Sequence, residues 1–153
     1  MAEALPNGDM RRKLRQQVIA NAPKAMLDAY WQKLGCDPAF TFLRGPETGL
    51  VALRGRIGGG GAPFPFGDAT ATRVSVRLEN GTAGHALVLG RERSRATIAA
   101  VIDALCHDGN MAARIDAELV GPLEQMILAR DDKRARQTAA TKVDFFTMVR
   151  GED

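Results

Sequence analysis

The sequence predicts an α+β fold, in which a four-stranded antiparallel sheet of two hairpins is flanked by two N-terminal helices and two or more C-terminal helices. Three observations support this prediction. Apolar residues recur at helical spacing before residue 35 and after residue 93. Eleven of the sixteen glycines lie between positions 45 and 90, and the segments beside them alternate apolar and polar residues. The length of 153 residues is that of a single domain, which we expect to span 1–153.

Two helices are expected before residue 35. Asp9 can cap the first helix, which should end near residues 21–23 because the residue before a proline avoids the helical conformation. Pro23 suits the first turn of the second helix, and Gly35 is its expected C-terminal stop. The apolar positions are Met10, Leu14 and Val18 in the first helix, and Met26, Leu27, Tyr30, Trp31 and Leu34 in the second.

The glycine-rich middle of the chain predicts four strands. Segments 40–44 and 50–57 flank "GPETG", which has the Pro and Gly of a tight turn. Segments 71–78 and 83–90 flank Asn80-Gly81, a strong signal for a two-residue hairpin. Alternation places Val74, Val76 and Leu78 on one face and Arg73, Ser75 and Arg77 on the other. We therefore expect a sheet with one solvated, arginine-lined face.

The C-terminal third predicts further helices. One begins at Ser94 and carries Ile98, Val101, Ile102 and Leu105 on its apolar stripe. Another region begins near Asn110 and carries Ile115, Leu119, Leu123, Met126 and Ile127, and Gly121-Pro122 should kink or divide it. Residues 129–142 are almost entirely polar, as in a solvated helix or a spacer.

Composition narrows the class of function. Arginine outnumbers lysine sixteen to five, which favours phosphate and carboxylate recognition, although a GC-rich genome gives the same bias. The net charge of +3 is small and dispersed, and no aromatic residues interleave with the arginine strands, so we expect no nucleic acid partner. We expect no membrane segment and no signal peptide, hence a cytoplasmic protein with free Cys36 and Cys106. No Cys or His pair has zinc-ligand spacing, so no metal site is predicted.

The stretch "RIGGGGAPFPFGDATATR" (56–73) is the first candidate site. Four glycines can turn backbone N–H groups toward an anion, and arginines beside such a loop can clamp phosphate oxygens. It lacks the Gly-Lys-Ser/Thr of a P-loop and enters a strand, and a flexible hairpin connection explains it equally well. The candidate phosphate or ligand-binding residues are Arg54, Arg56, Gly58, Gly59, Gly60, Gly61, Asp68, Thr70, Arg73 and Arg77.

We assign no catalytic residue among the other polar side chains. Glu47 can act as a general base, can pair with Arg44, or can simply be solvated. Cys106-His107 is not a catalytic dyad by sequence adjacency alone, and His107 suits a helix C-terminus. His85, in an alternating strand, is read as structural.

The chain ends in an apolar segment, "VDFFTMVRG". Termini are usually polar, and adjacent Phe145 and Phe146 point to opposite sides of an extended chain, so a groove or a second chain would bury both better than one flat surface. We interpret 138–153 as a docking tail, with packing on the chain's own core as the alternative. The candidate interface residues are Val143, Asp144, Phe145, Phe146, Met148, Val149 and Arg150.

Four stretches resemble one family. They are "PETGLVALRGRIGGGG" (46–61), "FGDATATRVSVRL" (66–78), "IDAL" (102–105) and "VDFFTMVRG" (143–151), and in this order they are similar to PhnG, the G subunit of the phosphonate carbon–phosphorus lyase core complex. The resemblance runs from about residue 10 to the end, with Lys142 where the family has an arginine-like residue.

The resemblance implies a function. The family acts with the PhnI, PhnH and PhnJ subunits, and with PhnL in the first step, so we expect a hetero-oligomer. In that step methylphosphonate displaces adenine from ATP, giving ribose 1-methylphosphonate 5-triphosphate. ATP is then a substrate of the complex, this chain binds no cofactor, and no catalytic residue can be carried over, so a non-catalytic or co-catalytic subunit is implied. The alternative is a stand-alone nucleotide- or phosphate-binding module built on the glycine loop and the arginine face.

Overall fold

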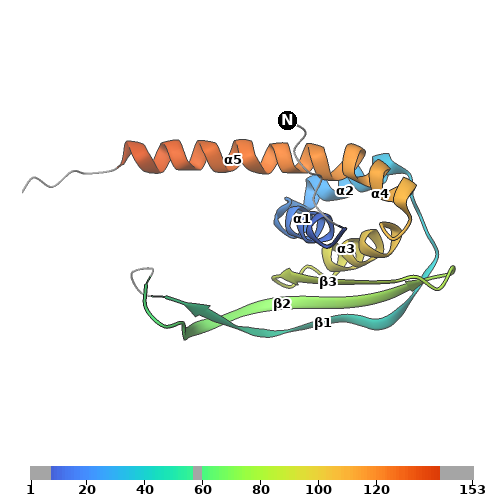
Figure 1. Ribbon diagram of the computed structural model, residues 1–153, viewed down its shortest axis with the longest axis horizontal. Coiled ribbons are helices and arrows are strands. Elements are labelled where there is room, and N and C mark those ends of the chain that lie inside the picture. Colours follow the sequence, from blue (N-terminus) through green and yellow to red (C-terminus); the bar gives the residue numbers. More distant parts are fainter. Residues whose placement is uncertain (1–7, 57–59, 142–153) are drawn as a thin grey trace, which may run out of the picture.

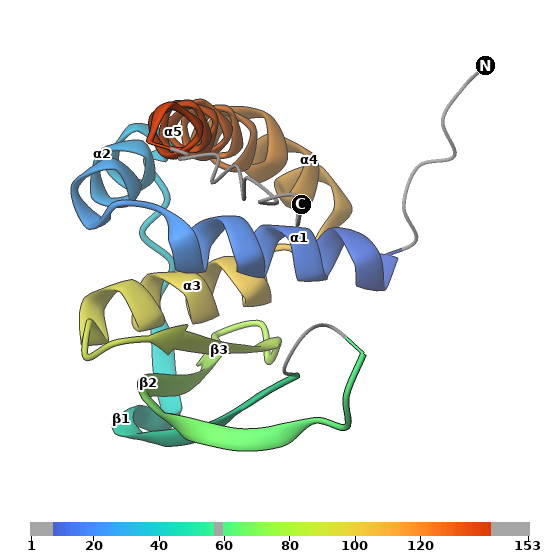
Figure 2. The same ribbon diagram turned by 90° about the vertical axis from the view of Figure 1, so that its left-hand side faces the viewer.

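Three antiparallel strands form a sheet, and the described helices all lie on one side of it (Figure 1). The computed structural model describes residues 8–56 and 60–141. Helix α3 lies on the sheet, α1 lies on α3, and α2, α4 and α5 form the outermost layer (Figure 2). The elements are α1 (Gly8–Asn21), α2 (Lys24–Leu34), β1 (Phe40–Gly55), β2 (Phe64–Leu78), β3 (Ala83–Leu89), α3 (Arg93–Leu105), α4 (Gly109–Ile115), the π-helical turn η2 (Asp116–Val120) and α5 (Gly121–Ala140).

The α+β class is confirmed, but the prediction of four strands is wrong. The predicted strand 40–44 does not pair with the predicted strand 50–57, because residues 40–44 and 50–55 belong to the single strand β1, which pairs along its length with β2. The "GPETG" segment stays extended, and bulges between Phe42 and Arg44 and between Arg44 and Glu47 absorb the irregularity. Pro46 is tolerated because β1 is an edge strand, where a missing N–H need not break a ladder.

The second hairpin follows the prediction. Strands β2 and β3 pair antiparallel across the turn at Gly81, which has a φ of 87°. Val74, Val76 and Leu78 are buried under α3, and Arg73 and Arg77 are exposed on the opposite side, as alternation predicts. We call the side that α3 covers the inner face and the opposite side the outer face.

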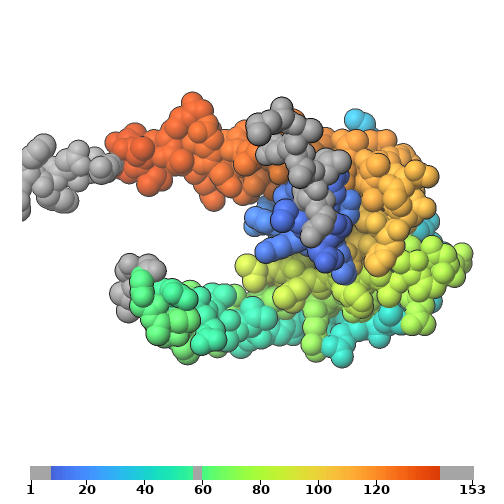
Figure 3. All heavy atoms as spheres, viewed as in Figure 1, coloured from blue at the N-terminus to red at the C-terminus, as the bar shows by residue number. Residues whose placement is uncertain are grey.

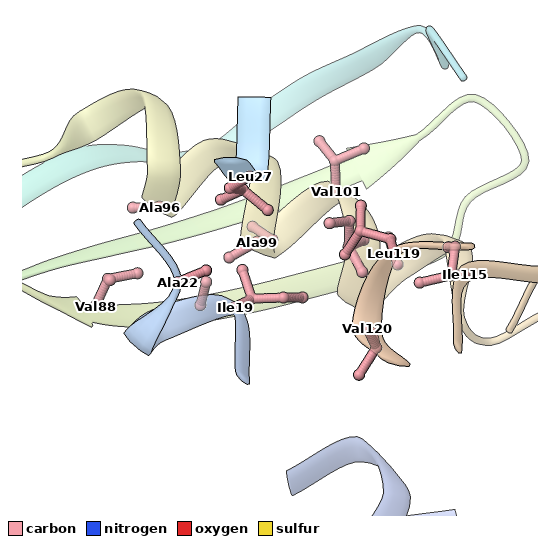
Figure 4. Packing of buried hydrophobic residues seen from close by; sticks show 14 of the residues in the cluster. Ile19, Ala22, Leu27, Val88, Ala96, Ala99, Val101, Ile115, Leu119 and Val120 are labelled. Atoms are coloured by element: carbon pink, nitrogen blue, oxygen red, sulfur yellow. The ribbon is translucent and has the colours of Figure 1, made fainter. Parts of the chain in front are cut away.

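The core lies between the inner face and the helices (Figure 4). It joins Ile19 and Leu27 from the N-terminal helices, Val88 from β3 and Leu119 from η2. Helix α3 presents mostly alanines to the sheet, namely Ala96, Ala99, Ala100 and Ala104. These small side chains let the helix approach β3 so closely that a Cβ on Gly84 would lie 2.1 Å from the carbonyl oxygen of Ala100.

The first helix departs from its predicted pattern. Only Val18 and Ile19 of α1 are buried, and Met10 is 59% exposed. The N-terminal half of α1 is attached through ion pairs instead, which Arg12 forms with Asp103 and Arg15 forms with Asp116. The apolar spacing of Met10 and Leu14 therefore predicts the helix correctly but does not identify its buried face.

The predicted division at Gly121-Pro122 is present as a π-helical turn. The N–H of Gly121 bonds the carbonyl of Asp116, five residues back, and Pro122 then lies in the first turn of α5. The polar residues after Leu128 continue α5 as a solvated helix to Ala140. This second half of α5 and the far end of the β1–β2 hairpin extend from the core in the same direction, with an open concavity between them (Figure 3).

Candidate functional site

The predicted phosphate site lies on the β1–β2 hairpin. The loop joining the two strands is at the end that projects beyond the helices (Figure 1). Gly58 and Gly59 lie outside the described residues, and Gly60 and Gly61 are exposed. Of the remaining candidates, Thr70 is half-buried, and Arg54, Arg56, Asp68, Arg73 and Arg77 are exposed.

The strand pairing separates these candidates. Asp68 pairs with Ala52 and Thr70 pairs with Leu50. By alternation along each strand, these residues lie on the inner side of the sheet. Arg54 follows Ala52 by two residues and so shares its side of β1, whereas Arg73 and Arg77 lie on the outer face. The hairpin thus does not bring the predicted set together at one point, and phosphate binding by these residues stays a prediction.

The outer face instead gathers polar residues near the middle of the sheet. Glu47 on β1 accepts a 3.0 Å hydrogen bond from Nε of Arg73 on β2, and the same carboxylate oxygen lies 2.9 Å from Nη2 of Arg73 in an ion pair. Its other oxygen lies 3.9 Å from Nε of Arg44, so one carboxylate bridges two arginines. Beside them, Ser75 Oγ and His85 Nδ1 form a 2.8 Å hydrogen bond across the two strands.

Toward the projecting end the outer face is apolar, which the prediction of an arginine-lined face did not include. Leu87 pairs with Arg73 and is 58% exposed, and Leu89 pairs with Ala71 and is 62% exposed. Val51 and Leu53 of β1 continue this surface and are half-buried. We call these four residues the apolar outer patch: Val51, Leu53, Leu87 and Leu89. No described helix covers it.

A buried carboxylate ties α1 to the edge of the sheet. Asp103 of α3 is 5% exposed and accepts two hydrogen bonds from Arg12, each 2.7 Å long, and one of 2.9 Å from the N–H of His85. Burial alone would raise the pKa of Asp103, but these hydrogen bonds outweigh burial and hold the pKa below its ordinary value. The carboxylate therefore stays ionised and positions both Arg12 and the backbone of His85.

The thiols and histidines do not form an activated pair. Burial raises the pKa of the Cys106 thiol to about 11, which is opposite to the shift of a nucleophilic cysteine. His107 is exposed after the end of α3. Within residues 8–56 and 60–141, no three Cys, His, Asp or Glu side chains are grouped so that they could hold a metal ion, and no helix there is long and apolar enough to cross a membrane.

The predicted docking tail, residues 143–150, falls outside the described part of the chain, so its role stays a prediction. Sequence reasoning missed Arg12, Ser75 and His85 as neighbours. Alternation did place Ser75 on the arginine face, but the pairing of Ser75 with His85 depends on hairpin register. The pairing of Arg12 with Asp103 joins residues 91 positions apart, and no local pattern signals it.

Together these features describe a small α+β protein whose sheet has one uncovered face, with a polar cluster and an apolar patch on that face. Residues 10–151 match the model of the family described as "Phosphonate metabolism protein PhnG", and the chain belongs to this family. It is also 43% identical, over 150 residues, to a protein of Rhizobium meliloti (strain 1021) named alpha-D-ribose 1-methylphosphonate 5-triphosphate synthase subunit PhnG. That alignment covers 95% of this chain and 93% of the relative.

Proposed function

We propose that this protein is a subunit of an alpha-D-ribose 1-methylphosphonate 5-triphosphate synthase complex in the cytoplasm. Its partners are the PhnI, PhnH and PhnJ subunits, with PhnL in the first step, and ATP is a substrate of the complex. The relative with 43% identity carries the name of such a subunit, and the alignment spans nearly the whole of both chains. The function therefore depends on assembly with other chains.

The apolar outer patch is the observation that supports assembly. A soluble protein gains by burying large contiguous apolar side chains, and larger exposed patches commonly mark interfaces. Leu87 and Leu89 stand side by side on β3, and Val51 and Leu53 extend the patch across the sheet. We assign this patch to contact with a partner subunit, PhnI.

The chain's own role is to shape the complex and its substrate surface, with the catalytic groups on a partner. The high pKa of the Cys106 thiol argues against covalent catalysis by that residue.

Co-purification of the assembled complex tests the proposal with a matched pair of variants. Leu89→Asp places a charge in the apolar outer patch, and Leu128→Asp places the same charge on α5 at the same 62% exposure. Both sites are exposed, so both variants should fold. We expect Leu89→Asp to reduce recovery of PhnI at least tenfold and Leu128→Asp to leave it unchanged. Full recovery with Leu89→Asp would remove the assignment of the interface to this patch.

The docking tail is tested separately. Deleting residues 143–153 should also prevent co-purification if Phe145 and Phe146 bind the partner. If recovery stays normal while the truncated chain loses stability, the tail packs on its own domain instead, and the assignment of the sheet patch is unaffected.

A further inference from the structure

A cavity of about 580 Å³ opens where the N-terminal half of α1 passes the free edge of β3, and it extends to the outer face of β2 and β3. This volume lies within the range of small-molecule sites and exceeds what a single inorganic ion needs. Four cationic side chains and one polar pair line it: Arg12 and Lys13 from α1, Arg44 from β1, Arg73 and Ser75 from β2, and His85 from β3. The cavity lies at the middle of the sheet, away from the glycine loop.

Two of the arginines are held together. Glu47 accepts a hydrogen bond from Nε of Arg73 and lies 3.9 Å from Nε of Arg44, so its negative charge reduces the repulsion between the two arginines. Nη1 of Arg73 makes no hydrogen bond to any described residue, which leaves donors for a ligand. Two neighbouring guanidinium groups can donate several hydrogen bonds to phosphate oxygens.

On the side of the cavity formed by α1 and β3, the side chains are held by hydrogen bonds. Asp103 holds Nε and Nη2 of Arg12 and the N–H of His85, and Gln16 donates a 3.0 Å hydrogen bond to the carbonyl of His85. The His85 ring is oriented by its hydrogen bond to Ser75. Because neighbouring residues already hold these side chains, a ligand would lose little affinity to ordering them.

The charges around the cavity favour an anion. Arg12 is paired with Asp103 and Arg73 with Glu47, and Asp9 also lines the cavity, so the four cations Arg12, Lys13, Arg44 and Arg73 exceed these three carboxylates by one positive charge. An anion with several charged oxygens can use the remaining N–H groups of these cations, and the Ser75 hydroxyl can donate to it in the tautomer in which Nδ1–H of His85 donates to Ser75 Oγ.

We propose that this cavity binds the phosphate groups of a small phosphate ester, such as a nucleoside or sugar polyphosphate. The site is built from this chain alone, so the proposal goes beyond the assignment of a subunit role and does not require it. Of the residues that the glycine-loop hypothesis named, only Arg73 takes part.

Titration calorimetry on the folded full-length chain tests the site, with ATP, tripolyphosphate and inorganic phosphate as separate probes. We expect ATP and tripolyphosphate to bind, and the double variant Arg44→Ala/Arg73→Ala to bind them at least tenfold more weakly. The matched control is Arg54→Ala/Arg56→Ala, which removes the same charge from the far end of the hairpin and should change affinity less than twofold. Far-UV circular dichroism verifies that each variant is folded.

Three results would overturn the proposal. They are no binding of any probe to the folded wild-type chain, equal weakening by the two double variants, and binding lost only in the Arg54/Arg56 variant. The second would mean general attraction to positive charge, and the third would place the anion at the glycine loop. Co-purification with partner subunits is measured on the same variants. Because Leu87 lines the cavity and also belongs to the apolar outer patch, weaker ligand binding with normal recovery is the result that separates the ligand site from the subunit interface.

Discussion

At the scale of single residues, Gly84 sets how close the sheet and α3 can approach. A Cβ at this position would lie 2.1 Å from the carbonyl oxygen of Ala100 and 2.4 Å from the backbone nitrogen of Ala104. Both contacts are with helix backbone, which cannot swing away as a side chain can. Glycine is therefore required here for space, and its backbone conformation does not demand it.

The first prediction concerns this contact. Gly84→Ala should lower the free energy of unfolding by about 3 kcal/mol, because overpacking must push α3 off β3. Urea denaturation followed by circular dichroism measures the loss. Gly67→Ala is the control, since that glycine is exposed on β2 with open space around it. Equal stability of the two variants would contradict the close packing.

The second prediction concerns the buried Asp103. Its folded-state pKa lies below the ordinary value, so its stabilising effect is full above the ordinary aspartate pKa and is lost as the pH falls through the lowered value. Asp103→Asn should cost about 1.5 kcal/mol at neutral pH, because the charged hydrogen bonds of Asp103 are weakened while the half-exposed Arg12 is still solvated.

The pH dependence separates this effect from a packing defect. Urea midpoints of wild type and Asp103→Asn, measured between pH 7 and pH 3, should approach each other as the pH is lowered. A constant gap across that range would mean that the charge on Asp103 is not what stabilises the fold.

At the scale of elements, the helices differ in how firmly they are attached. Helices α3 and α4 and the turn η2 contribute core residues. In α5 only Leu123 is buried, and the helix continues with exposed polar residues. The outer half of α5 is therefore held by its own hydrogen bonds and by side-chain pairs on its surface.

The third prediction follows from this difference. Ala113→Gly in α4 and Ala135→Gly in α5 are the same substitution at exposed helix positions. The first should lower the free energy of unfolding by about 1 kcal/mol, because α4 unfolds with the core. The second should change it by less than about 0.3 kcal/mol while reducing helical circular dichroism, since the outer half of α5 frays on its own. A full loss of stability in Ala135→Gly would show that α5 unfolds with the core.

What the sequence could predict at this scale depended on local signals. The turn at Asn80-Gly81, the stop at Gly35 and the division at Gly121-Pro122 were predictable, because each needs a particular backbone chemistry. Gly45-Pro46 carries the same composition as a turn, yet the long pairing of β1 with β2 overrides it with bulges. That outcome depends on tertiary pairing, which local pattern does not encode.

The polar cluster was predictable only in part. Alternation placed Arg73, Ser75 and Arg77 on one face, as the structure confirms. The neighbours of Arg73 come from β1 and β3, and their alignment depends on bulges and on register. The attachment of α1 through Arg12 and Asp103 could not be predicted, because these residues are 91 positions apart in the sequence and meet only in the folded chain.

At the scale of the whole molecule, the layers leave one surface uncovered. Helix α3 protects β2 from Thr72 to Leu78, but the segment from Phe64 to Thr70 extends beyond the helices with mostly exposed side chains (Figure 1). The chain thus has one stable body and one end that depends on outside contacts.

The fourth prediction tests this division by hydrogen exchange. In the isolated chain, amides between Phe64 and Thr70 should exchange at least tenfold faster than those between Thr72 and Leu78, because fewer buried contacts oppose local opening. In the assembled complex the difference should shrink as the partner covers the hairpin. An unchanged exchange pattern on assembly would place the interface elsewhere.

The two edges of the sheet carry a further consequence. An open edge normally offers a row of N–H and C=O groups on which a foreign strand can template itself. Here β1 is interrupted by Pro46 and two bulges, and the free side of β3 has its His85 groups occupied by Asp103 and Gln16. The edges thus oppose the addition of a foreign strand at these two places, near Pro46 and at His85. There a partner must recognise this protein by its side chains.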